Sequence, residues 1–239
     1  MSRITNECER WDVGRVNHIK VKSIKTCYNY PEYYWIIDGK PITVYLDEYV
    51  QNNSGNSLSG MGSMLGLLPA WSGELEWQWE NDFIWELVDC AEDTNVPILV
   101  CEDDCDLSCI VIVVHIRKVG NRVYWDRIGR LDHSNGNLKE EQQSGILCLE
   151  AYTDEDWEKY GDNIATERYG SHEYWKWVKE NCYEEHIRRL RNYMKPYMQK
   201  DKNIEWMQEL NWEFEAKEYQ IATEQYRELK RLKDKEKTV

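Results

Sequence analysis

Residues 96–129 read VPILVCEDDCDLSCIVIVVHIRKVGNRVYWDRIG and decide the fold. They contain the most apolar and β-branched run of the chain, Cys109–Ile116, and a second run, Arg122–Ile128, follows after Gly120-Asn121. Glycine and asparagine tolerate the positive φ that a tight hairpin turn needs. The stretch therefore predicts a β-hairpin at the centre of a sheet, preceded by a strand over Ile98–Cys101.

A dense acidic loop, Glu102–Asp106, lies directly before this hairpin. We expect it to form the functional edge of the sheet. The chain has no motif that specifies a known reaction, so inference about function depends on what this region could bind.

Acidic residues are concentrated in one third of the chain. The formal net charge is −14, and residues 31–110 carry 16 acidic side chains against one basic side chain, Lys40. Such a field repels phosphates, which disfavours direct nucleic-acid binding. It also speeds the approach of a basic partner. An acidic surface without a partner is the alternative, because acidic proteins are common.

The chain has 239 residues, enough for one large domain or for a domain with an added subdomain. It contains 12 tryptophans and 16 tyrosines but only 2 phenylalanines. Tryptophan and tyrosine bury large areas and keep a polar group, which suits an aromatic core and also a contact surface.

The first residues lack an apolar segment of signal-peptide length, and no window approaches the ~20 apolar residues of a membrane span. We therefore expect a cytoplasmic protein without a membrane contact. Its eight cysteines are then expected to be reduced thiols rather than a disulfide framework.

Two strands and two helices are expected before the strand over Ile98–Cys101. Val16–Ile24 alternates imperfectly, as edge strands do, and Tyr33–Ile37 is a short aromatic strand followed by an Asp38-Gly39 turn. A proline precedes a helix over Ile42–Val50. A second helix is expected over Glu74–Glu92, with an acidic face that would lie beside the acidic loop.

After a further strand over Ile146–Tyr152, the composition becomes helical. Thr153–Asp156 has a capping signature, and His172–Tyr193 carries apolar residues at a helical period. A last helix is expected over Ile204–Lys235. The sequence thus predicts an α+β fold: an antiparallel sheet with a central hairpin, helices packed on it, and a long helical C-terminal subdomain. The expected domains are residues 1–152 and 153–239.

Three cysteines, Cys101, Cys105 and Cys109, recur at four-residue spacing around the acidic loop. Zinc usually takes four protein ligands in structural sites, so three cysteines fall one short, and neighbouring acids raise the pKa of a thiol. The acids lack the EF-hand pattern, and no glycine-rich phosphate loop is present. We expect reduced cysteines, no metal and no cofactor; structural zinc is the alternative.

No histidine lies in a metal-binding pair or beside a nucleophile elbow. His115 falls in the apolar strand and is expected to be a core or hairpin residue. No catalytic residue is predicted, and the protein is not expected to be an enzyme.

Three groups of segments within residues 35–130 contain motifs that indicate structure but specify no chemical reaction. They are Ile37–Pro41 with Tyr45–Val50, Asn95–Cys101 with Asp103-Asp104, and Ser108–Val113 with Trp125–Gly129. These segments resemble a group of little-characterised bacterial and phage proteins of the toxin-immunity type. The resemblance implies an immunity-type role, supplies no catalytic residues, and does not extend to the part that begins at Thr153.

We therefore expect an inhibitor or immunity-type protein whose acidic surface covers the cationic cleft of a basic partner, a nuclease toxin or a nucleic-acid-binding effector. The residues expected at the contact are Glu74, Glu76, Glu80, Glu102, Asp103, Asp104 and Asp106. Two alternatives stay open: a phage anti-defence protein that binds a host defence complex through its C-terminal helices, and a metal-dependent hydrolase. A homo-oligomer formed through the last helix also stays open.

Overall fold

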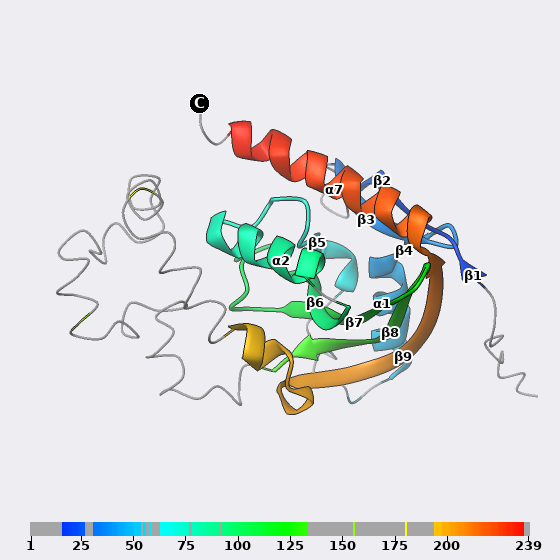
Figure 1. The fold of residues 1–239 in the computed structure, drawn as a ribbon. Helices are drawn as coiled ribbons and strands as arrows, with labels where there is room; N and C mark the ends of the chain where they lie inside the picture. Colours follow the sequence, from blue (N-terminus) through cyan, green and yellow to red (C-terminus); the bar gives the residue numbers. More distant parts are fainter. Residues whose placement is uncertain are drawn as a thin grey trace, which may run out of the picture.

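The computed structural model describes residues 16–26, 31–53, 55, 58, 63–76, 78–90, 92–132, 155, 180 and 194–236. In this part of the chain the fold contains two sheets and several helices (Figure 1). The predicted α+β class is confirmed. Figure 1 shows that the larger sheet is strongly curled and that a long C-terminal helix lies along one side of it.

The larger sheet has six strands in the order β1-β9-β8-β7-β6-β5. In chain order they are β1 (Val16–Asn17), β5 (Leu68–Pro69), β6 (Asp93–Val100), β7 (Val111–Val119), β8 (Arg122–Leu131) and β9 (Ile204–Glu215). Neighbours are antiparallel except β1 and β9, which are parallel. The last strand in sequence therefore lies between the first strand and the central hairpin.

The predicted hairpin is confirmed as β7 and β8. Gly120 has a φ of +60°, which the turn requires, and Val119 pairs with Arg122 at its base. The β-branched run Val111–Val114 is fully buried. Strand β6 extends further back than the predicted strand and begins at Asp93.

The predicted helix over Ile204–Lys235 is wrong in its first part, because Ile204–Glu215 form strand β9. Trp206, Leu210 and Phe214 lie four residues apart, a spacing that fits one face of a helix. The chain instead alternates at Leu210, Trp212 and Phe214, which are buried, whereas Trp206 is only partly buried. A strand paired with β8 buries them on one face of the sheet.

Strand β9 is long and bent (Figure 1). Its register with β8 shifts between Trp125 and Arg127, and Asn211 on the β9 side has a φ of +51°. This is the geometry of a β-bulge, which adds one residue to a strand and turns it. Asparagine tolerates that left-handed conformation better than most residues.

A smaller sheet has the order β2-β3-β4 and contains β2 (Ile19–Lys25), β3 (Pro31–Ile37) and β4 (Lys40–Pro41). Asp38 and Gly39 have φ of +46° and +87° and form the predicted turn after β3. The predicted edge strand over Val16–Ile24 is divided between β1 and β2, each at the edge of its own sheet. Helix α1 (Ile42–Asn52) follows with Pro41 at its N-cap, confirming the predicted helix.

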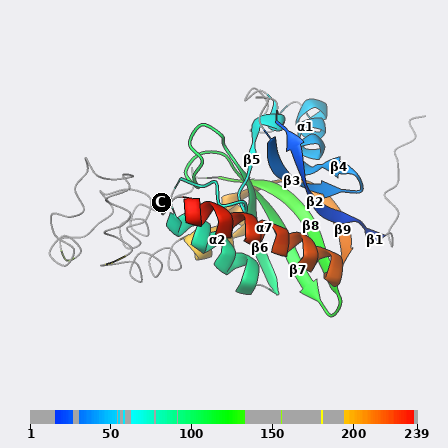
Figure 2. The ribbon, with the colours of Figure 1, turned by 90° about the horizontal axis from the view of Figure 1, so that it is seen from above.

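Helices α2 (Gln78–Cys90) and α7 (Ala216–Glu236) lie next to each other over the larger sheet (Figure 2). Helix α2 confirms the helix predicted over Glu74–Glu92, with shorter bounds. Single 3₁₀ turns occur at η1 (Met64–Gly66) and η6 (Asp201–Asn203). Strand β9 belongs to the sheet, and the described α-helical residues after residue 153 are Glu155, Glu180, residues 194–198 and α7. The predicted helical C-terminal subdomain is therefore supported only in part.

An aromatic cluster joins the two sheets and α7. Trp35 on β3 is completely buried, and its ring lies 5.0 Å from Trp71, 5.6 Å from Trp125 on β8 and 4.7 Å from Tyr226 on α7 between centroids. Edge-on and tilted aromatic pairs at such distances add stability beyond their buried area. Part of the tryptophan and tyrosine content thus forms the core.

Several predicted elements lie outside the described residues. They are the strand over Ile146–Tyr152, the capping segment Thr153–Asp156 apart from Glu155, and the helix over His172–Tyr193 apart from Glu180. The division at residue 152 therefore stays a prediction for that part of the chain.

Candidate functional site

The acidic loop lies in the connection between β6 and β7, residues 101–110. The Cys101 N–H donates to Ile110 O at 2.9 Å, which continues the pairing of the two strands. The Cys105 N–H donates back to Cys101 O at 3.0 Å, and Cys105 has a φ of +50°. The connection is therefore a folded turn anchored on two central strands.

The segment before α2 docks on this turn. The Glu76 N–H donates to Cys105 O at 2.9 Å. Burial raises the pKa of the Cys105 thiol, and the neighbouring Cys101, Glu102 and Glu76 raise it further. Glu76 and the acidic loop therefore belong to one local negative field.

Side-chain exposure within this field is uneven. Glu76, Asp103 and Asp104 are exposed, whereas Glu102 and Asp106 are partly exposed. The Asp106 carboxylate accepts hydrogen bonds from the N–H and hydroxyl of Ser108 at 2.8 and 2.7 Å. The structure thus brings together five of the seven residues that were predicted to contact a partner.

Glu80 is buried and not exposed as the prediction requires. Its side chain is only 1% exposed, so it cannot form part of a contact surface. One carboxylate oxygen accepts the Leu107 N–H at 3.2 Å, and the other has no partner in the described structure. Burial, and then the charge of Asp106, raise the pKa of Glu80 well above its ordinary value. Its role is to hold the turn against α2.

The structure also differs from the prediction at Glu74 and on the acidic face of α2. Carboxylates there form ion pairs with basic side chains of α7 and do not face a partner. Glu74 forms an ion pair with Lys233 of α7. Asp82 lies 2.9 Å from Lys230, and Asp89 lies 2.6 Å from Arg227. The expected continuous acidic patch is therefore divided: α2 is paired with α7, and the acidic loop with Glu76 is separate from that pairing.

A basic stripe on α7 was the sequence signal for this pairing. Arg227, Lys230 and Lys233 recur every three residues, so they share one side of a helix. The stripe could have been matched with the acidic face of the helix predicted over Glu74–Glu92. The assignment of the last helix to a separate subdomain does not predict this pairing.

Two thiols and one carboxylate meet in the same turn. Cys101 Sγ, Cys109 Sγ and a carboxylate oxygen of Asp104 all lie within 4.8 Å of one another. Burial, followed by hydrogen bonds with Asp104 and Cys101, raises the pKa of Cys109 to about 12. Cys105 is outside this group, because its thiol donates to Glu102 O at 3.0 Å. The residue types suit a thiophilic cation.

His115 occupies the hairpin position that was predicted for it. Its Nδ1 lies 2.9 Å from Asn95 Oδ1, and its Nε2 lies 3.3 Å from Asp93 and 3.7 Å from Asp126. Arg117 also pairs with Asp126 at 3.0 Å. In the described part of the chain this cluster includes no nucleophile, so it is a polar network on the sheet.

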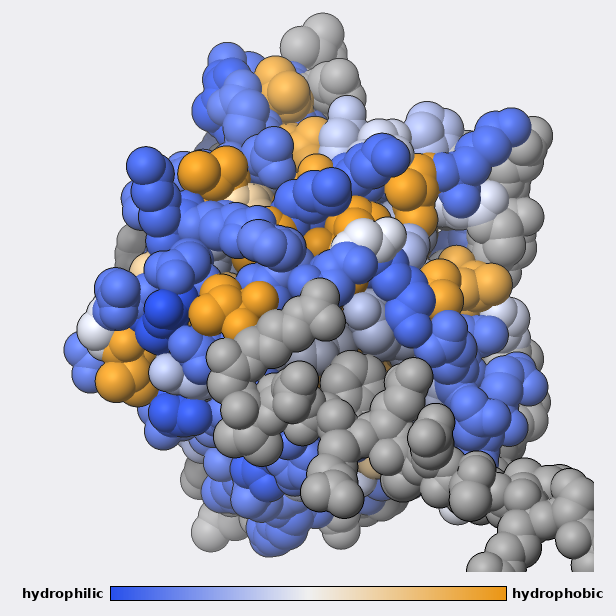
Figure 3. Space-filling view, turned by 90° about the vertical axis from the view of Figure 1, so that its right-hand side faces the viewer, coloured by the Kyte–Doolittle hydropathy of each residue, from blue (hydrophilic) through white to orange (hydrophobic). Residues whose placement is uncertain are grey.

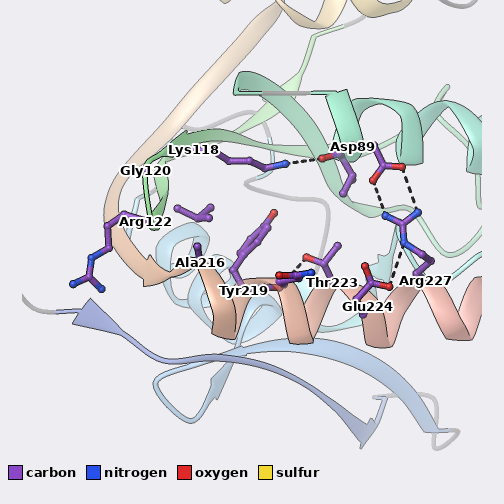
Figure 4. A pocket seen from close by; sticks show the side chains of 12 residues that line it. Asp89, Lys118, Gly120, Arg122, Ala216, Tyr219, Thr223, Glu224 and Arg227 are labelled. Atoms are coloured by element: carbon purple, nitrogen blue, oxygen red, sulfur yellow. Dashed lines mark hydrogen bonds and ion pairs between the residues drawn. The ribbon is translucent and has the colours of Figure 1, made fainter.

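A pocket of about 260 Å³ opens between α7, the end of α2 and the hairpin turn (Figure 4). Tyr219 rises into it from α7. Its basic side chains have protein partners: Lys118 donates to Val88 O at 2.8 Å, Arg227 pairs with Asp89, and Arg122 pairs with Glu213. An anionic ligand would have to displace these contacts.

Exposed apolar side chains are scattered. On the face shown in Figure 3, apolar residues form small separate spots among hydrophilic ones. The large apolar residues that the described structure exposes come from different elements: Tyr33, Leu65, Val119, Ile221 and Leu232. The described residues of that face therefore form no broad apolar docking area.

Comparisons with protein-family models, curated proteins and solved structures give no match. Among the helices described, none combines the length and apolar character that crossing a bilayer requires.

Proposed function

We propose that the protein is an inhibitor of the immunity type, which binds a basic protein partner through an acidic surface and blocks its cationic cleft. The surface consists of Glu76, Glu102, Asp103, Asp104 and Asp106. The observation that supports it is the docking of Glu76 on the acidic loop, which gathers carboxylates from two segments on an anchored turn.

Electrostatics favour a binding role for this surface. Like charges held close together repel one another and destabilise the fold, so their concentration costs free energy in the isolated protein. A cationic partner removes this repulsion and is steered toward the surface during diffusion. The partner expected from the chemistry is a nuclease toxin or a nucleic-acid-binding effector, since both have basic clefts.

The rigid base of the turn supports the same role. Backbone hydrogen bonds tie it to β6, β7 and the segment before α2. A pre-organised surface loses little conformational entropy on binding, which favours affinity.

The product of the neighbouring reading frame is the probe for this proposal. We expect it to be a basic protein whose nuclease activity the purified chain inhibits at a one-to-one ratio. We also expect the association rate to fall steeply with salt, because exposed charges are screened beyond about 10 Å at 0.1 M ionic strength.

Two double variants with the same change in net charge locate the surface. Glu76→Gln/Asp103→Asn should slow association and flatten its salt dependence. Electrostatic steering raises association rates by roughly 10- to 1000-fold, and this variant removes part of that increase. Glu209→Gln/Glu224→Gln neutralises two exposed carboxylates on β9 and α7 and should leave the rate nearly unchanged. Equal rates for both variants, or no inhibition of the probe, would contradict the proposal.

The alternative is an anti-defence protein that acts through its C-terminal helices. Truncation of the C-terminal part cannot test it. Strand β9 lies between β1 and β8, so a deletion from residue 200 would remove an interior strand of the sheet. Charge reversal at exposed α7 positions keeps the fold and is the suitable experiment.

A further inference from the structure

The turn between β6 and β7 presents a donor set of which the proposed contact surface includes only Asp104. Two thiols and one carboxylate converge from Cys101, Asp104 and Cys109, with their donor atoms within 4.8 Å of one another. We infer that these three residues bind one Zn²⁺ ion. The inference is separate from the inhibitor proposal, and either can fail without the other.

The spacing of the donor atoms is close to what zinc requires. A zinc–sulfur bond is about 2.3 Å long, so two sulfurs on a tetrahedral ion lie about 3.8 Å apart. The two sulfurs need to approach by about 1 Å or less to reach that geometry. Rotation of exposed or partly exposed side chains supplies such a shift without moving the strands.

The fold explains why these three residues converge. Cys101 directly follows β6, and Cys109 lies two residues before β7, the neighbouring strand. The Cys101 N–H donates a hydrogen bond to Ile110 O at 2.9 Å, which continues the pairing of the two strands. The left-handed conformation of Cys105 turns the chain back and sets Asp104 beside the two thiols. Zinc would therefore bind on a base that the sheet already fixes.

The chemistry of the donors selects the ion. Two thiolates favour zinc over the hard cations magnesium and calcium, which prefer oxygen ligands. Three protein ligands leave the fourth position of a tetrahedral site open for water or for a group from another molecule. The neighbouring Glu102, Asp103 and Asp106 raise the local concentration of cations.

Binding is a proton-for-metal exchange. Two S–H bonds break, two zinc–sulfur bonds form, and two protons pass to the buffer; no electron is transferred. Because one Zn²⁺ replaces two protons, the net charge of the turn is unchanged. Zinc would fix the turn, and the negative field of the other carboxylates would remain.

The direct test titrates ZnCl₂ into the full chain, kept reduced and treated with a chelator, in competition with a chromophoric chelator. We expect one ion per chain. Loss of a group outside the ligand shell already weakens metal sites about 10- to 100-fold, so Cys101→Ser and Cys109→Ser should each cost about 100-fold or more. Asp104→Asn should weaken binding less.

Cys105→Ser is the matched control, because it removes a thiol of the same turn that bonds to Glu102 O instead. Its zinc affinity should stay within about twofold of the wild type. Equal losses in Cys105→Ser and Cys101→Ser, or no stoichiometric binding by the wild type, would overturn the inference.

Alkylation of the wild-type chain gives a readout that does not depend on the folding of variants. Zinc should protect Cys101 and Cys109 from a thiol reagent, located by peptide mapping, and leave labelling of Cys105 unchanged. Protection of neither cysteine in reduced protein would contradict the site. Loss of both thiols on exposure to air without zinc would identify a disulfide pair instead and would also count against it.

Discussion

The carboxylates of α2 and those of the acidic loop come from the same acidic third of the chain, but their surroundings are opposite. Asp82 and Asp89 of α2 face Lys230 and Arg227 of α7 at 2.9 and 2.6 Å. Asp103 of the loop is exposed, and no ion pair within the described residues involves it. The first set holds two helices together, whereas Asp103 of the second set is directed to solvent.

Acidic composition alone does not identify a binding surface. The two sets differ only in what the fold places beside them. Paired, partly buried charges contribute to stability, whereas clustered exposed charges cost stability and favour an external cation. Variants of the two regions should therefore separate into stability effects and binding effects.

The largest loss is expected at the base of the α2–α7 contact. Gly73 has a φ of +82°, and a Cβ there would lie 3.0 Å from Lys230 Cα. Gly73→Ala combines a left-handed backbone, about 1–2 kcal/mol, with overpacking, about 1–3 kcal/mol. Urea denaturation should show a loss of about 2–5 kcal/mol.

Gly120→Ala is the matched control for that variant. Gly120 has a φ of +60° but nothing within 4 Å of its Cβ position. It should cost only the backbone part, about 1–2 kcal/mol. Equal losses would mean that the approach to α7 does not matter.

The second effect concerns the ion pairs themselves. Lys230→Ala removes partners from Asp82 and Asp234, and Lys230 is only 14% exposed. We expect a loss of about 1–3 kcal/mol in urea denaturation, between the values for exposed and buried pairs. Restoration of full stability by Asp82→Asn in the Lys230→Ala background would indicate that uncompensated charge causes the loss.

Glu80 links the two regions and predicts a pH dependence. Its pKa in the folded protein is raised above 4.5 by burial and then by Asp106. The native state keeps a proton that the unfolded chain releases, so the contribution of Glu80 is present below about pH 4.5 and is lost as pH rises through the folded pKa. The slope approaches about 1.4 kcal/mol per pH unit inside that window.

Glu80→Gln should remove this slope, since glutamine keeps the acceptor for the Leu107 N–H but does not titrate. Denaturation midpoints measured at intervals between pH 4 and 8 give the comparison. A variant that loses stability with pH as steeply as the wild type would show that another group is responsible.

The smallest effect is expected in the loop. Asp103→Asn removes one exposed carboxylate, and exposed substitutions usually change stability by less than about 0.5 kcal/mol. A slight gain is consistent with relief of repulsion. A loss comparable to that of Lys230→Ala would mean that the acidic loop also supports the fold.

The hairpin and the acidic loop could be predicted from local sequence, because β-branched runs and Gly120-Asn121 carry their own structural preference. Strand β9 could not, because Trp206, Leu210 and Phe214 fit a helical period while Leu210, Trp212 and Phe214 fit a strand. Pairing with β8 decided between them, and pairing is not encoded locally.

The site was predictable only in part for the same reason. The clustering of acids near the hairpin was visible in the sequence, but the burial of Glu80 depends on how α2 packs. The meeting of Cys101, Asp104 and Cys109 depends on the left-handed turn at Cys105 and on strand pairing. Sequence spacing indicates neither.

The place of β9 has a consequence for synthesis on the ribosome. Strand β8 ends at Leu131 and its partner begins at Ile204, so the hairpin emerges long before β9 does. During that interval β8 is an unpaired edge, the kind of surface on which nascent chains associate wrongly. The parallel contact of β1 with β9 pairs Val16 with Glu213, so it can form only after that distant part of the chain has been translated.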